Sequence, residues 1–441
     1  MTIAERLAHF ICETGSIPAE AEQSALKCVF DLLGAAIAGF GTPNAIAVRQ
    51  IAGATWGAGP APIWFAGGRL TPAGASFVNA ACACALDLDD GHRAAAGHPG
   101  AAIIPAVFSM LDASVDAQRA LIAIALGYEI GVRISAARDL KTIPTVNSGL
   151  WSGQAVAAAV GWMRRLSPRQ IAHAIAIAGT TAPSQSATAY TRFRGNSVKE
   201  GIPWGAANGV LAVDLAQAGF TGPIDLLDDP TRFDPAVLLD RLGQGWQINN
   251  TYFKPYSCCR WLHAPVDALL ALMAEHDIAA ADIVGIETET FGRTLTLSNE
   301  IEPATLEGGQ YSLPFCLGVA ATRGALALLP MREGSLTDAA ALQMAKRVTM
   351  TVRPEFDAMF PAAVPGAVRV TTASGVFDRT VLMPRGEPVN PMTWEDIDAK
   401  FLTIAAERID VPTANGIRSA IAALRAGDIA PLQSILAAQC L

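Results

Sequence analysis

The chain has 441 residues, a hydrophobic fraction of 51% and a formal net charge of −8 at pH 7. This length exceeds the size at which one hydrophobic core stops growing, so we expect two domains. The acidic balance and the lack of basic runs argue against a nucleic-acid partner, and no uncharged apolar run reaches the ~18 residues that would suggest a membrane span.

The N-terminal segment MTIAERLAHFICETGS has no basic region followed by an apolar core, so we expect no signal peptide. The eight cysteines do not resemble a disulfide framework, and Cys82-Ala-Cys84 and Cys258-Cys259 lack the spacing of a zinc knuckle. We therefore expect a cytoplasmic protein without a metal site.

From residue 2 to about 270, apolar residues recur at helical spacing almost throughout. The predicted helices are 19–40, 71–86, 101–113, 116–137, 152–166, 167–179 and 205–220. Proline and glycine fall between these segments more often than inside them, as expected of residues that begin and end helices. The second helix leads directly into a segment that is rich in ionisable residues.

The pattern changes after about residue 275, where alternating Val and Thr predict strands. The predicted strands are 283–292, 346–356, 366–375 and 376–384, the last two joined by a Ser-Gly turn, with a helix at 312–329 among them. From residue 396 the chain returns to helix. We therefore predict a mainly α protein, with a large all-helical domain of residues 1–270, joined by C-terminal helices 396–441, and a smaller α+β domain of residues 271–395.

Ionisable side chains gather in four segments of this otherwise apolar chain. The segments are LDLDDGHRAAAGHPG (86–100), RFRGNSVKEGIPWGAANG (192–209), FKPYSCCRWLH (253–263) and EGGQYSLPF (307–315). Basic residues before a helix start, as in the second segment, suit an anion. Together the segments supply Asp, His, Lys, Arg, Tyr and Cys without a nucleotide or metal motif. That inventory suits proton abstraction beside a carboxylate, where an enolate-like anion needs a base and cationic partners.

Each candidate also has a plainer interpretation. Asp89 and Asp90 would serve equally well to cap the next helix or to lie in solvent. His98 would pass for an ordinary loop histidine, and lysines such as Lys199 and Lys254 most often lie at the surface. Read singly, no segment is decisive.

Five motifs, in order along the chain, resemble the MmgE/PrpD family. They are DLDDGH…GHPG (87–100), K-x-G-x-P-x-G-A-A-x-G (199–209), AQAGFTGP (216–223), FKPYSCCRWLHAPVDA (253–268) and YSLPF (311–315). The family contains 2-methylcitrate dehydratase, cis-aconitate decarboxylase and iminodisuccinate epimerase. The resemblance spans nearly the whole chain. It implies a large helical domain, a smaller α+β lid, a homodimer, no organic cofactor and an active site between the domains.

The resemblance also implies roles for single residues. The family's site aspartate matches Asp87, its His-Pro histidine matches His98, and its two site lysines match Lys199 and Lys254. We take these four as catalytic candidates, with His98 as the base. The substrate-binding candidates are His92, Arg194, Tyr256, Cys259, Arg260 and His263. Among these, His263 matches the histidine that closes the K-P-Y segment. Because alanine-rich helices leave more apolar surface than a small lid can cover, we also expect the homodimer on physical grounds.

The chain departs from the family's patterns at four positions. Gly91 stands where the decarboxylase branch has threonine, and Asn147 stands where that branch offers a histidine. Phe315 replaces the tyrosine of an S-x-P-Y motif found in many members, and Cys259 occupies a histidine position beside Lys254. We therefore expect an enzyme other than a cis-aconitate decarboxylase.

The reactions of this family pass through a carbanion α to a carboxylate or through its protonation. The loss of the Thr and Tyr hydroxyls removes two acids for a leaving group, while Lys and His proton carriers remain. This favours epimerisation of a small dicarboxylate such as iminodisuccinate. Dehydration of a 2-methylcitrate-like tricarboxylate is the alternative, and a non-catalytic anion-binding protein is a third possibility. In each case the partner is a small di- or tricarboxylate.

Overall fold

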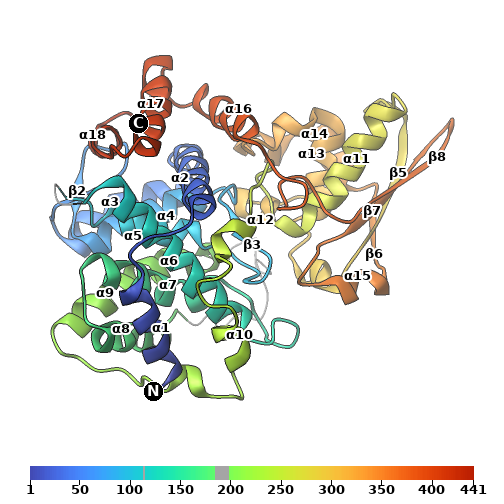
Figure 1. Cartoon of the computed structure of the whole chain (residues 1–441). Coiled ribbons are helices and arrows are strands. Elements are labelled where there is room, and N and C mark those ends of the chain that lie inside the picture. Colours follow the sequence, from blue (N-terminus) through green and yellow to red (C-terminus); the bar gives the residue numbers. More distant parts are fainter. Residues whose placement is uncertain (113–114, 184–197) are drawn as a thin grey trace.

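The computed structural model describes residues 1–112, 115–183 and 198–441. Two hydrophobic cores organise them (Figure 1). One core joins residues between 3 and 253 with residues between 392 and 436, and we call this unit the helical body. The other is built mainly from residues between 256 and 370, and we call the unit formed by residues 256–381 the lid. The predicted mainly α class with a smaller α+β unit is confirmed.

The helical body is a stack of helices in which α4, α5, α6, α7 and α9 pack around one another. Its helices are α1 (Ile3–Glu13), α2 (Ala19–Gly39), α3 (Pro43–Trp56), α4 (Pro72–Cys84), α5 (Gly100–Phe108), α6 (Ala117–Ala136), α7 (Gly149–Met163), α8 (Pro168–Thr180), α9 (Ile202–Gln217) and α10 (Pro235–Leu239). Small residues set the spacing of the central pair, because a Cβ on Gly131 of α6 would lie 2.4 Å from the Cβ of Ala155 in α7. Such close approach buries both backbones in a dense core.

The C-terminal helices α16 (Trp394–Ala405), α17 (Val411–Arg425) and α18 (Ala430–Ala437) return to the body, as the sequence predicts. Figure 1 shows them at the top of the molecule beside α2. Phe401 of α16 contributes to this packing, with its ring centroid 4.9 Å from that of Phe30 in α2. The body is therefore closed by chain that has first passed through the lid.

The lid contains a four-stranded sheet in the order β6-β5-β7-β8. The strands are β5 (Ile283–Thr290), β6 (Val348–Val352), β7 (Gly366–Thr372) and β8 (Gly375–Val381), with β5 and β6 parallel and the other pairs antiparallel. The lid helices are α11 (His263–Glu275), α12 (Leu306–Gln310), α13 (Leu313–Arg323), α14 (Ala339–Ala345) and α15 (Pro354–Met359). Helix α11 packs on β7 and β8, and α12 lies between the sheet and the body (Figure 1).

The structure differs from the sequence prediction in several places. The two cores divide near residue 255 rather than at 270, because the buried face of α11 (Val266, Leu269, Leu272) joins the lid core. The predicted strand 346–356 ends at Val352, since proline begins a short helix at 354, and the predicted helix 312–329 ends at Arg323 before a glycine with φ of 76°.

Residues 2–270 are also less helical than predicted. Short strands and turns interrupt the pattern, among them the pairings of β1 (Ala61–Pro62) with β2 (Arg69–Leu70) and of β3 (Gly91–His92) with β4 (Thr251–Tyr252), and the left-handed turn Val198–Gly201. The Pro- and Gly-rich stretch after α9 forms mostly turns. Within the described ranges, no single helix is long and apolar enough to cross a membrane, and α2 with α3 would qualify only as a pair bent by 92°.

Candidate functional site

Asp87 lies at the centre of the site, just beyond the C-terminus of α4. Its backbone N–H donates to the carbonyl of Cys84 (3.1 Å), and its φ of 55° reverses the chain in the left-handed region, which residues other than glycine rarely adopt. The turn leaves only 2% of the residue exposed. A carboxylate buried to this extent must be paired with cations or with hydrogen-bond donors.

Two lysines provide that pairing. The Nζ of Lys254 lies 2.5 Å from Oδ2 of Asp87, and the Nζ of Lys199 lies 3.4 Å from Oδ1. Both lysines are buried, so neither follows the surface interpretation. Burial alone would raise the pKa of Asp87, but the ammonium groups of Lys254 and Lys199 hold it well below its ordinary value. Asp87 is therefore an anion at neutral pH.

His98 approaches the same carboxylate from the loop before α5. Its Nε2 lies 3.9 Å from Oδ1 of Asp87, while its Nδ1 lies 2.7 Å from the carbonyl oxygen of Asp90 and 3.3 Å from Oδ2 of Asp89. Burial alone would lower the pKa of His98, but the Asp89 carboxylate outweighs it and the pKa rises to about 9. His98 is therefore an imidazolium at neutral pH.

A left-handed turn carries Lys199 into the site. Val198, Lys199 and Glu200 have φ values of 47°, 47° and 57°, and Gly201 follows with 70° before α9 begins. Backbone in this region costs on the order of 1 kcal/mol or more for each residue with a Cβ, so it persists only where surrounding contacts enforce it. The turn directs the side chains of Lys199 and Glu200 to different partners.

The lid supplies the partners of Lys199. Its Nζ donates to Oε1 of Gln310 (3.0 Å), and its backbone N–H donates to Oε1 of Glu307 (3.2 Å), both from α12. The ring of Tyr311, the next residue along, has its centroid 5.3 Å from the same Nζ. The site is thus assembled from both units, with Asp87, His98 and Lys199 from the body and Gln310 and Tyr311 from the lid.

Glu200 connects the turn to the His98 loop. Its Oε2 accepts hydrogen bonds from the backbone N–H (3.2 Å) and the hydroxyl (2.9 Å) of Ser148, while the Oγ of Ser148 accepts from the backbone N–H of His98 (3.0 Å). The hydroxyl of Tyr311 donates to Oε1 of Glu200 at 3.3 Å. One carboxylate therefore links the loop of His98, the turn of Lys199 and the lid.

A second set of polar residues fixes the segment that carries Asp87 and His98. Lys400 of α16 donates to Asp31 (2.7 Å) and to the carbonyl of Leu88 (2.8 Å), which fixes the backbone beside Asp87. Asp90 accepts from the backbone N–H of Gly100 (3.1 Å) at the start of α5 and from the Tyr128 hydroxyl. Burial raises the pKa of Asp90 to about 7. Asp90 therefore has the helix-start role considered from the sequence, whereas Asp89 is buried beside His98 rather than solvated.

Arg260 and His263 belong to a framework beside the site. The guanidinium of Arg260 donates from Nε and Nη2 to Oε1 of Glu387 (3.0 and 2.8 Å), and its Nη1 bonds Nδ1 of His263 at 3.1 Å. The Nε2 of His263 lies 3.1 Å from the Cys258 carbonyl, and burial, followed by the nearby Arg260, lowers the pKa of His263 well below its ordinary value. His263 is thus neutral. These contacts position the chain around Lys254, and the substrate-binding role of both residues stays a prediction.

The other predicted binding residues have separate surroundings. The ring of His92 contacts the Gln247 carbonyl (3.0 Å), and burial lowers its pKa to about 4. The Tyr256 hydroxyl donates to Asp267 (2.8 Å) inside the lid. The backbone of Cys259 donates to the Gln310 carbonyl (2.8 Å), and burial, followed by the Asp87 charge, raises the pKa of its thiol. Arg194 lies outside the described residues.

The structure gives a physical reason for one of the four departures noted in the sequence. A Cβ on Gly91 would lie 2.2 Å from the Tyr252 hydroxyl, so no threonine fits against this tyrosine. Phe315 is fully buried in the lid core, and its ring would lie 2.9 Å from a Cβ on Gly309. A phenol nevertheless reaches the site from Tyr311, one turn earlier.

Sequence reasoning missed several residues of this cluster. Gln310 and Tyr311 fall in the fourth ionisable segment, and the quoted YSLPF motif marks their position, but no role was assigned to them. Glu200 directly follows a predicted site lysine and would have been found by asking what fixes that lysine. Ser148 and Lys400 carry no local signal, because their positions depend on long-range packing.

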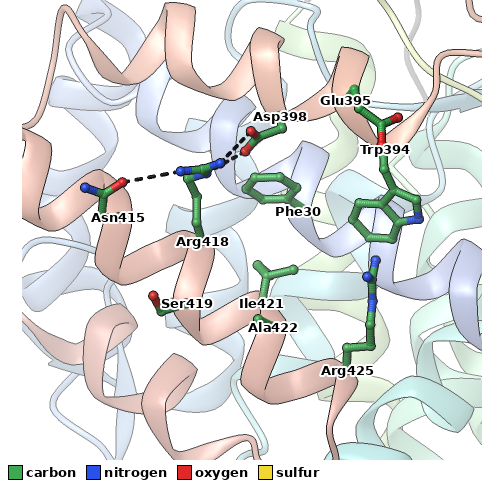
Figure 2. Close-up of a pocket in the computed structure, with 10 residues that line it drawn as sticks. All are labelled: Phe30, Trp394, Glu395, Asp398, Asn415, Arg418, Ser419, Ile421, Ala422 and Arg425. Atoms are coloured by element: carbon green, nitrogen blue, oxygen red, sulfur yellow. Dashed lines mark hydrogen bonds and ion pairs between the residues drawn. The ribbon is translucent and has the colours of Figure 1, made fainter.

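Of two surface hollows, one borders the site and the other does not. A cleft of about 530 Å³ borders it on the lid side, where Ala85 and Glu307 contribute to its wall. A second hollow of about 490 Å³ lies between α2, α16 and α17 (Figure 2). There Arg418 pairs with Asp398 (2.7 Å), and the guanidinium of Arg425 lies 4.2 Å from the ring centroid of Trp394. Its cations thus already have partners, and its lining includes none of the clustered residues around Asp87.

Known proteins resemble this chain over most of its length. The sequence profile of the MmgE/PrpD N-terminal domain matches residues 5–242, and that of the MmgE/PrpD C-terminal domain matches residues 256–426. The cis-aconitate decarboxylase-like protein oryM of Aspergillus oryzae is 25% identical over 411 residues, covering 84% of this chain and 83% of the relative. The cis-aconitate decarboxylase of Aspergillus terreus strain NIH 2624 is 27% identical over 410 residues, with 84% and 82% covered. The second profile begins at residue 256, where the two hydrophobic cores divide, and extends over α16 and α17, which pack on the body.

Proposed function

The chain belongs to the MmgE/PrpD family, and from this premise we propose that it is a lyase acting on a small di- or tricarboxylate. In the proposed reaction, a carbanion forms α to a carboxylate when a neighbouring group leaves, and His98 protonates that carbon. Lys199 and Lys254 hold the substrate carboxylate. No organic cofactor takes part, in line with what the family resemblance implies.

One observation carries this proposal, namely the charge arrangement around Asp87. Three cationic groups (His98, Lys199 and Lys254) surround one carboxylate in a buried position. A carbanion α to a carboxylate places its charge on the carboxylate oxygens, and buried ammonium groups stabilise that charge far more than exposed ones would. An imidazole whose pKa is about 9 already carries the proton that the carbanion needs.

The protonation state of His98 favours a decarboxylating lyase over an epimerase or a dehydratase. In a decarboxylation, the electron pair of the breaking C–C bond stays on the α carbon and CO2 leaves. Nε2 of His98 then gives its proton to that carbon and regains one from solvent, so no base is required. An elimination of water or an epimerisation must begin with proton abstraction, and His98 would have to lose its proton first.

The relatives support the same class, because those compared are cis-aconitate decarboxylases or resemble them. We expect a substrate other than cis-aconitate itself. The departures of Gly91, Phe315 and Cys259 from the family's patterns support this expectation.

Epimerisation is the second candidate, and a separate observation favours it. His98 and Lys199 reach Oδ1 of Asp87 from different chain segments, at 3.9 and 3.4 Å. An epimerase needs two proton carriers, one on each side of the substrate carbon, and this pair could provide them. The iminodisuccinate-like substrate considered from the sequence is the corresponding test compound.

One experiment separates these possibilities. The purified protein is incubated in D2O with citrate-like tricarboxylates, cis-aconitate and iminodisuccinate, and the mixtures are followed by NMR. A decarboxylating lyase gives CO2 with a deuterated product carbon, whereas a new vinyl signal without CO2 means that water leaves and contradicts His98 as the proton donor. An epimerase incorporates deuterium at Cα without a change of skeleton. If all compounds stay unchanged while one of them raises the melting temperature, the chain binds anions without catalysis and the proposal fails.

We also propose that the protein is a homodimer and that one face of the body is covered by a second copy. Ile51 of α3 and Trp204 and Leu211 of α9 are 56%, 45% and 50% exposed. The rings of Trp56 and Trp204 both lie against Phe77 of α4, at 5.5 and 5.0 Å, so the three helices form one surface. Large apolar side chains gathered in this way are typical of protein interfaces.

A further inference from the structure

We propose that the hydroxyl of Tyr311 is a further catalytic group of this site, a hydrogen-bond donor to the substrate carboxylate on which the carbanion charge develops. The inference rests on the proposed function. It assigns a role to a lid residue, whereas the four catalytic candidates named from the sequence lie outside α12 and α13.

The ring of Tyr311 lies beside a lysine of the site. Tyr311 follows α12 directly and is 1% exposed. Its ring lies over Nζ of Lys199 at 5.3 Å, and Gln310, its neighbour in sequence, accepts from that same Nζ at 3.0 Å. A cation over an aromatic face is an attractive contact that grows stronger away from water. The phenol is therefore held beside the lysine that pairs with Asp87.

The hydroxyl of Tyr311 makes a long hydrogen bond to Glu200. Its contact with Oε1 of Glu200 is 3.3 Å long, whereas O–H···O bonds between good partners are about 2.7–2.8 Å. A substrate carboxylate oxygen at that normal distance would be a better acceptor than Glu200. Burial, together with the Asp87 and Glu200 carboxylates, raises the pKa of Tyr311 well above its ordinary value. The phenol therefore keeps its proton and acts as a donor throughout the accessible pH range.

The different positions of Tyr311 and Phe315 support a specific placement of the Tyr311 hydroxyl at the site. Both aromatic residues come from the same segment of the lid, but Phe315 packs beside Gly309 in the lid core. Tyr311 instead points its hydroxyl across the boundary to Glu200 of the body. A polar group at the meeting point of two buried surfaces is well placed to contact a ligand bound between them.

The test compares two variants that each lose one buried lid hydroxyl. Tyr311→Phe is expected to lower kcat by about 10²-fold with little change in KM, because the lost donor acts on charge that exists mainly in the transition state. Thr288→Val is the matched control. It removes the hydroxyl of a buried lid threonine that donates to the carbonyl of Ala367 (3.1 Å), and it should stay within about threefold of the wild type. Tyr311→Met provides a second measurement if the Phe variant does not fold.

The outcomes are distinct. A Tyr311→Phe variant with wild-type kcat, or equal losses in Tyr311→Phe and Thr288→Val, would overturn the role of Tyr311 and leave the proposed lyase intact. A rise in KM with unchanged kcat would also overturn it, because the hydroxyl would then serve binding or lid closure. If the wild type converts none of the carboxylates tested, the proposed function fails, and this inference fails with it.

Discussion

Asp89 keeps His98 protonated, and Asp89→Asn removes that charge while preserving the shape of the side chain. The Asp89 carboxylate is the largest influence that raises the pKa of His98 to about 9, while burial and Lys254 lower it. We therefore expect the pKa of His98 in the variant to fall to its ordinary 6.5 or below. At about pH 7.5 the protonated fraction would drop from nearly all to about a tenth, so activity should fall about tenfold if His98 is the acid.

The assay is kcat/KM as a function of pH for the wild type, Asp89→Asn and a control. The wild type should be active at neutral pH and lose activity as the pH rises through about 9. In the variant the same loss should occur at 6.5 or below. Asp267→Asn removes a lid carboxylate that bonds Tyr256 and should leave the profile in place. A wild-type profile that rises through about pH 9 would make His98 a base and refute the reasoning, as would an unshifted profile in Asp89→Asn.

Three further predictions concern His98, Lys254 and the proposed dimer face. His98→Gln should lower turnover by about 10²-fold. It should also lower the melting temperature, because the imidazolium stabilises the fold fully below pH 6.5 and this contribution is lost as the pH rises through about 9. Equal stability of the wild type and the variant at every pH would contradict this. Lys254→Met should lower the free energy of unfolding in urea by about 3–5 kcal/mol, since it leaves Asp87 buried without its nearest cation. Asp87→Asn in the same chain should recover part of that loss, and no recovery would argue against the pairing. Trp204→Glu should convert the proposed dimer to a monomer in light scattering, and a variant that stays dimeric would place the interface elsewhere.

The fold was largely predictable because its elements follow local periodicity. Helices such as α2 and α6 combine long apolar runs with clear ends, and the Val/Thr alternation marks β5 and β7. The domain boundary was placed too late because α11 has the same apolar character as the body helices. Nothing in its local sequence shows that its buried face packs on a sheet formed by later residues.

The site was predictable in its residues and less so in its connections. The segments that carry Asp87, His98, Lys199 and Lys254 stand out because ionisable groups are rare in this chain. The sequence could not show that His98 is buried beside Asp89, which changes its expected protonation state and therefore its role. The sequence also could not show that the His98 ring contributes to the packing of its loop, through the contact of its Nδ1 with the Asp90 carbonyl oxygen.

The backbone conformation ties the chemistry to the docking of the lid. Asp87, Lys199 and Glu200 all have positive φ values, which cost on the order of 1–3 kcal/mol each unless the surroundings enforce them. The enforcing contacts come partly from across the boundary, since Gln310 bonds Lys199 and Tyr311 bonds Glu200. If the lid separated from the body, these contacts would be lost and the turn at 198–201 could relax. Because the four candidate catalytic groups are buried in the docked arrangement, we infer that substrate enters with the lid apart, and that its return restores both the strained turn and the positions of Lys199 and Tyr311.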